Sequence, residues 1–139
     1  MDDCIFCGIV AGTIPARIVA EDERTVTFLD IHPATRGHCL VIPRTHARDI
    51  VDIAPEELAA CARAAQRAAR RAVDVLGAPA VNLLNSSRPE AWQTVFHFHI
   101  HVIPRYAGDP LVLPWQPAPA DPAALDEVHG VLRDQTHMP

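Results

Sequence analysis

Apolar and polar positions form short blocks in the first third of the chain. β-Branched and aromatic residues dominate 18–19, 26–29 and 39–42, and polar or turn-forming residues separate these runs. Such runs predict strands, because these side chains suit a pleated sheet, and the polar stretch between the first two predicts a hairpin. Pro43 would end the third strand, since proline cannot donate to a sheet ladder.

The period of the pattern then lengthens. Apolar residues recur at helical spacing over 58–76, while arginines occupy the opposite face. Pro55 suits the first position of a helix, and Gly77 supplies a stop after the last one. The pattern predicts one long helix over 55–76, with its arginines forming a solvated face.

Two more strands are predicted in the second half of the chain, at 80–84 and 95–103, joined by the polar loop 85–92. The segment 104–122 holds six prolines, too many for regular structure, and a short helix with Asp121 as its cap follows it. These elements indicate an α+β fold with an antiparallel sheet of about five strands, one long helix and a shorter C-terminal helix.

The composition limits the classes to which the chain can belong. Its 139 residues suit a single domain spanning 1–139, and 49% of them are hydrophobic. A formal net charge of -5 argues against non-specific nucleic-acid binding, which needs many basic contacts to phosphates. No apolar run approaches the roughly eighteen residues that cross a bilayer, and residues 1–8 do not resemble a signal peptide. We therefore expect a cytoplasmic protein with neither a membrane nor a nucleic-acid partner.

Three histidines alternate with apolar residues on the last predicted strand. Side chains alternate across a strand, so His97, His99 and His101 should share one face, with Phe98 and Ile100 on the other. The apolar face explains the stability of the strand, but three polar imidazoles need another explanation. The pattern alone leaves two open: ligands of a catalytic zinc, or a nucleophilic imidazole assisted by its neighbours.

The residues around these histidines resemble the signature of the histidine-triad superfamily. That signature is His-φ-His-φ-His-φ-φ, where φ is apolar, preceded by Gln-Ser/Thr-Val, and residues 93–103 match it. Further matches in family order include Ile14-Pro15-Ala16, Phe28-Leu29-Asp30-Ile31, Gly37-His38 and Leu40-Val41-Ile42-Pro43. The resemblance covers about residues 4–106, implies a HIT-like fold, and leaves the proline-rich tail 107–139 without a recognisable motif.

The resemblance implies a nucleotide hydrolase or transferase that works by phosphoryl transfer in two steps. His99 attacks the α-phosphorus of a purine nucleotide derivative, and water then releases the nucleoside monophosphate from the nucleotidyl-histidine. His101 and His38 would donate to the phosphate, and Thr94 would assist the leaving group unless it is an ordinary strand residue. The implied substrates are nucleoside phosphoramidates or dinucleoside polyphosphates. The implied nucleotide-binding residues are Ile5, Phe6, Ile9, Phe28, Asp30, Ile31, Asn85, Gln93 and Val95.

A Cys-x-x-Cys pair, Cys4 and Cys7, lies near the start of the sequence. In a cytosolic chain this spacing indicates a metal half-site or a redox pair before a structural disulfide. The resemblance to zinc-binding bacterial members implies a structural Zn²⁺ with His46 and His97 as the other ligands. The alternatives are an unmetallated thiol pair, and a His97 that only orients its neighbours.

The resemblance also implies a homodimer, formed through the long helix and an adjoining strand. Trp92 stands where many family members have glycine, and it either stacks against a substrate or partner subunit or merely covers its loop. Two rival functions remain: a zinc-dependent hydrolase whose metal sits on the three strand histidines, and a nucleotide-binding regulatory module with little turnover.

Overall fold

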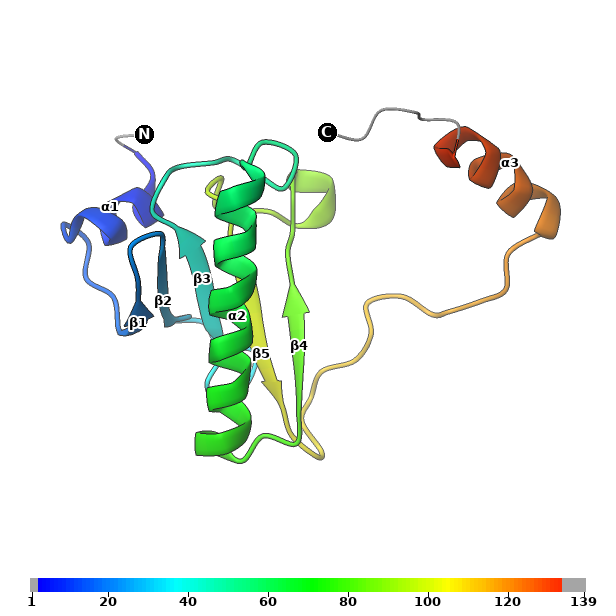
Figure 1. The fold of residues 1–139 in the computed structure, drawn as a ribbon. Helices are drawn as coiled ribbons and strands as arrows, with labels where there is room; N and C mark the ends of the chain where they lie inside the picture. The colour runs from blue at the N-terminus through cyan, green and yellow to red at the C-terminus, as the bar shows by residue number, and fades with distance from the viewer. Residues whose placement is uncertain (1–2, 134–139) are drawn as a thin grey trace.

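A computed structural model describes residues 3–133 of the chain, and it contains a five-stranded antiparallel sheet in the order β1-β2-β3-β5-β4 (Figure 1). The strands are β1 Ile18–Glu21, β2 Thr25–Leu29, β3 Cys39–Pro43, β4 Ala80–Leu84 and β5 Ile100–Arg105. The helices are α1 Ile5–Ala11, α2 Pro55–Leu76 and α3 Pro122–Arg133, with a 3₁₀ turn, η1, at Pro89–Ala91. The predicted α+β class, the five strands and the long helix are confirmed.

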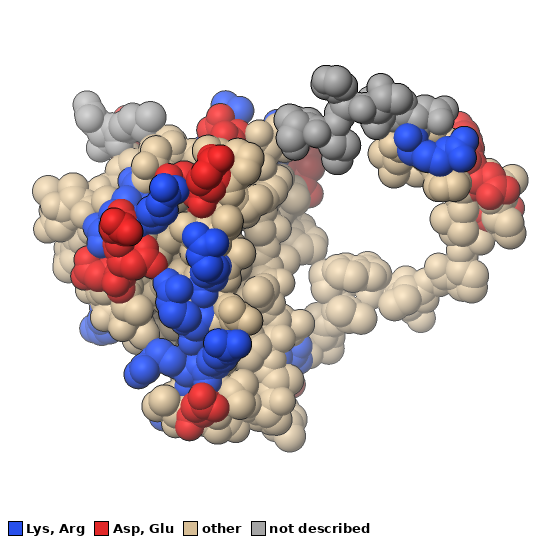
Figure 2. All heavy atoms as spheres, viewed as in Figure 1, with Lys and Arg blue, Asp and Glu red and all other residues tan. Residues whose placement is uncertain are grey.

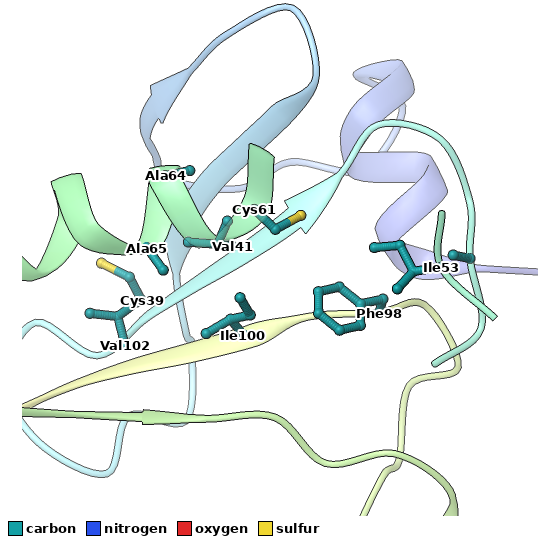
Figure 3. Close-up of a cluster of buried hydrophobic side chains, with 10 residues drawn as sticks. Cys39, Val41, Ile53, Cys61, Ala64, Ala65, Phe98, Ile100 and Val102 are labelled. Atoms are coloured by element: carbon teal, nitrogen blue, oxygen red, sulfur yellow. The ribbon is translucent and has the colours of Figure 1, made fainter. Parts of the chain in front are cut away.

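Helix α2 covers one face of the sheet. Small residues on its inner side, such as Cys61 and Ala65, allow it to lie close to Val41 of β3 and to Phe98 (Figure 3). Gly77 ends the helix in the left-handed conformation with φ 70°, as the stop signal predicted. Figure 2 shows basic side chains along the outer side of α2, and its arginines are exposed, as predicted for a solvated face.

Helix α1 lies on the opposite face and was not predicted. Its seven residues begin after Cys4, whose Sγ atom accepts a hydrogen bond from the backbone nitrogen of Cys7, and end at Gly12 in the left-handed conformation. Phe6 and Ile9 of this helix pack against apolar residues of β2 and β3, completing a second core on this side. So short a helix depends on this tertiary packing, since its own periodicity is too brief to read.

Strand β5 begins at Ile100, so the predicted start at residue 95 is wrong. Residues 95–97 form bends and residues 98–99 have no regular structure, because the backbone groups of this segment pair with loops and side chains instead of a neighbouring strand. The Phe98 nitrogen donates to the Ala47 carbonyl at 2.7 Å, and Asn85 Nδ2 donates to the His99 carbonyl at 2.9 Å. Only the third histidine of the motif belongs to the regular strand.

The C-terminal part extends away from the sheet (Figure 1). Helix α3 starts at Pro122, as predicted, but its apolar face, Leu125, Val128 and Leu132, is exposed. Among the described residues, no helix has both the length and the apolar character needed to cross a bilayer.

Candidate functional site

A cavity of about 460 Å³ lies between α1, the end of β2 and the histidine segment. This volume is within the range of about 300–1,000 Å³ that is usual for small-molecule sites. Most of the predicted catalytic and nucleotide-binding residues line it: Ile5, Phe6, Ile9, Phe28, Asp30, Ile31, Thr94, Val95, His99 and His101. Three others, His38, Asn85 and Gln93, lie behind the wall.

His99 is buried at the cavity wall in a defined tautomer. Its Nδ1 atom lies 2.7 Å from the carbonyl oxygen of His97, and because a carbonyl only accepts, Nδ1 carries the hydrogen. The Nε2 atom therefore keeps its lone pair. Burial lowers the pKa of His99 below its ordinary value and outweighs the opposing effects of the His97 carbonyl and Asp30. His99 is thus a neutral imidazole with a free nucleophilic nitrogen.

A hydrogen-bond chain sets the tautomer of His101. The backbone nitrogen of Ala34 donates to His38 Nδ1 at 2.9 Å, so His38 carries its hydrogen on Nε2. That atom lies 2.9 Å from His101 Nδ1 and 3.5 Å from an Asp30 oxygen. His101 therefore accepts at Nδ1 and carries its own hydrogen on Nε2, where it is available as a donor.

Burial keeps both members of this chain neutral. It lowers the pKa of His101 to about 4, assisted by the nearby His99 and His38. It also lowers the pKa of His38, against the opposing effect of the Asp30 carboxylate. Both ring nitrogens of His38 take part in this series of hydrogen bonds, with the Ala34 nitrogen and with His101. His38 therefore contacts His101 rather than the cavity.

Asn85 and Gln93 connect backbone segments behind the cavity wall. The Asn85 side chain donates to the His99 carbonyl and accepts from the Ser87 hydroxyl at 2.9 Å. Gln93 is buried, and its Nε2 atom donates to the carbonyls of Arg48 at 2.7 Å and Val95 at 3.1 Å. The nitrogen and the oxygen of both amide side chains each have a protein partner, which makes these residues supports for the wall.

A second cluster joins α1 to the histidine segment. The ligand atoms of Cys4, Cys7, His46 and His97 all lie within 4.8 Å of one another. His97 Nδ1 is 3.4 Å from Cys4 Sγ, 3.5 Å from Cys7 Sγ and 3.2 Å from His46 Nδ1. Neighbouring ligand atoms around a tetrahedral zinc with these donors are about 3.3–3.8 Å apart, given the usual Zn–N and Zn–S bond lengths. The four side chains therefore fit a closed Cys2His2 zinc site.

His97 is prepared for such a role. Its Nε2 atom donates to the Pro43 carbonyl at 2.8 Å, leaving Nδ1 unprotonated toward the cysteines. Burial lowers the pKa of His97 to about 4, against the effect of that carbonyl, and the nearby His46 and His99 lower it further. A ligand histidine held by a backbone carbonyl through its other nitrogen is the usual arrangement in metal sites.

The three motif histidines do not converge on one point. Among residues 3–133, the groups able to hold a metal are the Cys2His2 cluster and the trio Asp30, His38 and His101. Neither contains all three motif histidines, and the trio is already joined by the contacts described above. This geometry does not favour the rival zinc hydrolase.

Sequence reasoning missed the groups that set the tautomers and support the wall, namely the Ala34 nitrogen, the Pro43 and His97 carbonyls and the Ser87 hydroxyl. Three of these four are backbone atoms, which every residue has, so no residue type marks them.

Trp92 is 62% exposed and lies in the left-handed region with φ 75°. Its ring therefore does not cover the loop.

Comparison with known proteins gives consistent results. A HIT domain family model matches residues 11–108. The chain is 41% identical over 116 residues to "Protein hit" of Bacillus subtilis, covering 83% of this chain and 80% of that protein.

Two solved structures are informative. A Zn-bound histidine triad family protein from Mycobacterium smegmatis superposes with a TM-score of 0.77 at 42% identity, covering 94% of this chain and 98% of that one. A histidine triad nucleotide-binding protein from Candida albicans superposes with a TM-score of 0.83 at 28% identity, covering 96% of each chain. With the matched model and the histidine segment at the cavity wall, these similarities show that the chain belongs to the histidine triad (HIT) family.

Proposed function

We propose that the protein is a nucleotide hydrolase or transferase that cleaves purine nucleotide derivatives at the α-phosphate through a nucleotidyl-His99 intermediate. The observation that carries the proposal is the tautomer of His99, whose Nε2 lone pair lies at the wall of the cavity while Nδ1 is held by a carbonyl. Membership of the HIT family supports a nucleotide hydrolase or transferase in general.

The apolar part of the cavity, formed by α1 and β2, accepts the base between side chains such as Phe6 and Phe28. Asp30 lies in the same wall. Its Oδ1 atom accepts from the His32 nitrogen at 2.8 Å, and each carboxylate oxygen has a second lone pair for a ribose hydroxyl. Thr94 and Val95 form the wall beside the histidines, near the departing group. Binding in this orientation brings the α-phosphorus to His99.

In the first step His99 Nε2 attacks the α-phosphorus, and the bond from phosphorus to the leaving group breaks. The positive charge that develops on His99 is stabilised by its Nδ1–H bond to the His97 carbonyl. The His101 Nε2–H group donates to the phosphoryl oxygens, and a donor already in place needs no reorganisation as charge develops. The leaving group accepts a hydrogen bond from the Thr94 hydroxyl and takes its proton from water. A second water molecule then attacks the phosphorus, and the bond from phosphorus to His99 Nε2 breaks. The attacking water gives its proton to the solvent, so the nucleoside monophosphate and neutral His99 are released.

His38 is a positioning residue in this scheme. It receives a hydrogen bond from Ala34 and contacts His101 Nδ1, so it keeps the His101 hydrogen on the nitrogen available to phosphate. Removing it would release the other tautomer of His101, whose free nitrogen repels phosphate oxygens.

The test mixes the purified protein with adenosine phosphoramidate or with diadenosine polyphosphates and searches by mass spectrometry for a nucleotidyl adduct on His99. We expect the adduct in the wild type and a loss of turnover by more than about 10³-fold in His99→Ala. His129→Ala, on the exposed helix α3, is the matched control and keeps the wild-type rate. An unchanged rate in His99→Ala would refute the mechanism, whereas tight nucleotide binding without turnover in the wild type would favour the regulatory module.

We also propose that Cys4, Cys7, His46 and His97 hold a structural Zn²⁺. The ligand distances support this, and the Mycobacterium smegmatis relative is zinc-bound. A bound ion would crosslink α1 to the histidine segment without taking part in the reaction. Metal analysis should find about one zinc per chain in the wild type and in Cys39→Ala, and none in Cys7→Ser. Equal zinc in wild type and Cys7→Ser would refute the assignment.

A homodimer is the third part of the proposal. Strand β4 lies at an edge of the sheet, and Leu83 and Leu84 on it are exposed. Val73 and Val75 of α2 are exposed as well, and so is the apolar face of α3. Exposed apolar residues on β4 and α2, and on α3 away from the sheet, support association with a second copy.

A further inference from the structure

Two arginines converge on one buried carboxylate near the cavity. The Asp49 side chain is 0% exposed, and its Oδ2 atom accepts from Nε of Arg48 at 3.4 Å and from Nε of Arg88 at 3.3 Å. Its other oxygen accepts from the backbone nitrogens of Val51 and Asp52 at 3.0 Å each. Burial by itself raises the pKa of Asp49, but these hydrogen bonds outweigh burial and leave the pKa below its ordinary value. The charged carboxylate therefore accepts one hydrogen bond from each guanidinium group.

The two guanidinium groups keep unused donors. The bonds to Asp49 use only the Nε atoms, and within residues 3–133 no acceptor other than Asp49 contacts either side chain. Arg48 is 61% and Arg88 56% exposed at the side chain. The Asp52 carboxylate also lies close by, since it accepts from the Arg48 backbone nitrogen at 2.8 Å. Two guanidinium groups with free donors suit the oxygens of a phosphate or carboxylate.

The backbone places Arg88 in an unusual way. Its φ of 77° and ψ of 159° lie in a region that favours glycine, so the conformation is imposed by its surroundings. The Arg88 nitrogen donates to Gln93 Oε1 at 2.6 Å, and its carbonyl accepts from the nitrogens of Ala91 and Gln93. The bonds hold the start of η1 in one position and with it the base of the Arg88 side chain.

Gln93 links the backbones of both arginines to the wall of the cavity. Its Nε2 atom donates to the Arg48 carbonyl and to the carbonyl of Val95, which lines the cavity with His99. The same side chain accepts from Arg88. In Figure 1 the loop between β3 and α2 and the turn η1 lie at the same end of the molecule. The part of the wall formed by Val95 belongs to the segment that follows η1, whereas α1 and β2 form the apolar part of the cavity.

We propose that Arg48 and Arg88 form an anion subsite for the leaving group, so that the protein prefers substrates with negative charge beyond the scissile bond. The inference rests on the proposed function, since only a nucleotidyl transfer has a leaving group. The arginines form and break no covalent bond; they hold the anion while the bond from phosphorus to it breaks. A phosphate chain and a carboxylated amine share this chemistry.

The test compares kcat/KM for three substrates. Adenosine phosphoramidate has a neutral leaving group, diadenosine tetraphosphate has a phosphate chain, and the phosphoramidate of adenosine monophosphate with aspartic acid has a carboxylated amine. In Arg48→Gln and Arg88→Gln the ratio of an anionic to the neutral substrate should fall about tenfold, the loss of one charged hydrogen bond. Arg88→Lys should recover most of it, and Arg70→Gln on α2 is the control. The anionic substrate with the larger fall identifies the source of the charge. An unchanged ratio, or an equal loss with all three substrates, would overturn the proposal.

A binding measurement separates this proposal from the proposed function. Calorimetric titration with tripolyphosphate should give a dissociation constant that rises about tenfold in Arg48→Gln and Arg88→Gln but not in Arg70→Gln. If the wild type turns over none of the substrates but shows this pattern, the enzymatic function fails and the anion subsite stands. Identical binding in all variants overturns the subsite.

Discussion

Replacing Gln93 by glutamate tests whether this buried side chain supports the loops or contacts the nucleotide. Gln93→Glu keeps the size of the side chain and an acceptor for Arg88, but it removes the donor that bonds to the Arg48 and Val95 carbonyls. Two lost hydrogen bonds, with a carboxylate oxygen now facing two carbonyl oxygens, should lower the free energy of unfolding by about 2–4 kcal/mol. Unfolding entropy is about 2.1 cal/mol/K per residue, so for 139 residues a loss of about 3 kcal/mol lowers Tm by about 10 °C.

Thermal denaturation of the wild type, Gln93→Glu and Gln66→Glu measures this effect. Gln66 is exposed on α2, so the same chemical change there should alter stability by no more than about 0.5 kcal/mol. KM for adenosine phosphoramidate, measured below the melting range, shows any direct effect on binding. A Gln93→Glu variant with the Tm of the wild type and a large increase in KM would refute the supporting role and restore Gln93 as a nucleotide ligand.

Three further outcomes follow from the structure. Phe98→Ala should lower the free energy of unfolding by about 3–5 kcal/mol in chemical denaturation, because Phe98 is 1% exposed, whereas Phe96→Ala, at a 45% exposed site, should cost less than about 1 kcal/mol; equal losses would contradict the assigned core. The value of kcat/KM should fall with decreasing pH only below pH 6.5, because burial lowers the pKa of His99. As the pH falls through that pKa, a proton on Nε2 removes the nucleophile. A decrease of kcat/KM that already begins above pH 6.5 would show that His99 is not neutralised by burial. Leu125→Asp combined with Val128→Asp should convert a dimer to a monomer in size-exclusion chromatography with light scattering, because both residues lie on the exposed apolar face of α3; an unchanged mass would exclude this face from the interface.

Local sequence patterns were sufficient for most of the secondary structure. The long helix has twenty-two residues, enough for its period to be read, and both Pro55 and Gly77 act as their conformational preferences predict. The sequence pattern predicted neither helix α1 nor the true start of β5, because neither is visible in a short local pattern. Seven residues are too few for a clear period, and residues 95–99 look like a strand although their partners are loops distant in the sequence.

The candidate site shows a similar division. The sequence named most residues of the cavity wall and all four of the Cys2His2 cluster through the family resemblance. Further residues line the cavity but were not predicted as site residues: Ile14, Pro15, Ala16, Leu29, His32 and Leu40. The separate positions of His97 and His99 were not derivable from alternation on a strand, since neither residue belongs to β5. His97 points its free nitrogen to the cysteines, whereas His99 lies at the cavity.

By itself, the sequence determined the α+β architecture, the histidine segment and the membership in a family, because these depend on residue type and order along the chain. Tertiary structure decided which nitrogen of each histidine carries the hydrogen, because that choice depends on backbone atoms such as the Ala34 nitrogen and the carbonyls of Pro43 and His97. It also brought Arg88 to the Asp49 carboxylate, which lies 39 residues earlier beside Arg48. Backbone atoms are the same in every residue, and only the fold determines which of them meet a side chain.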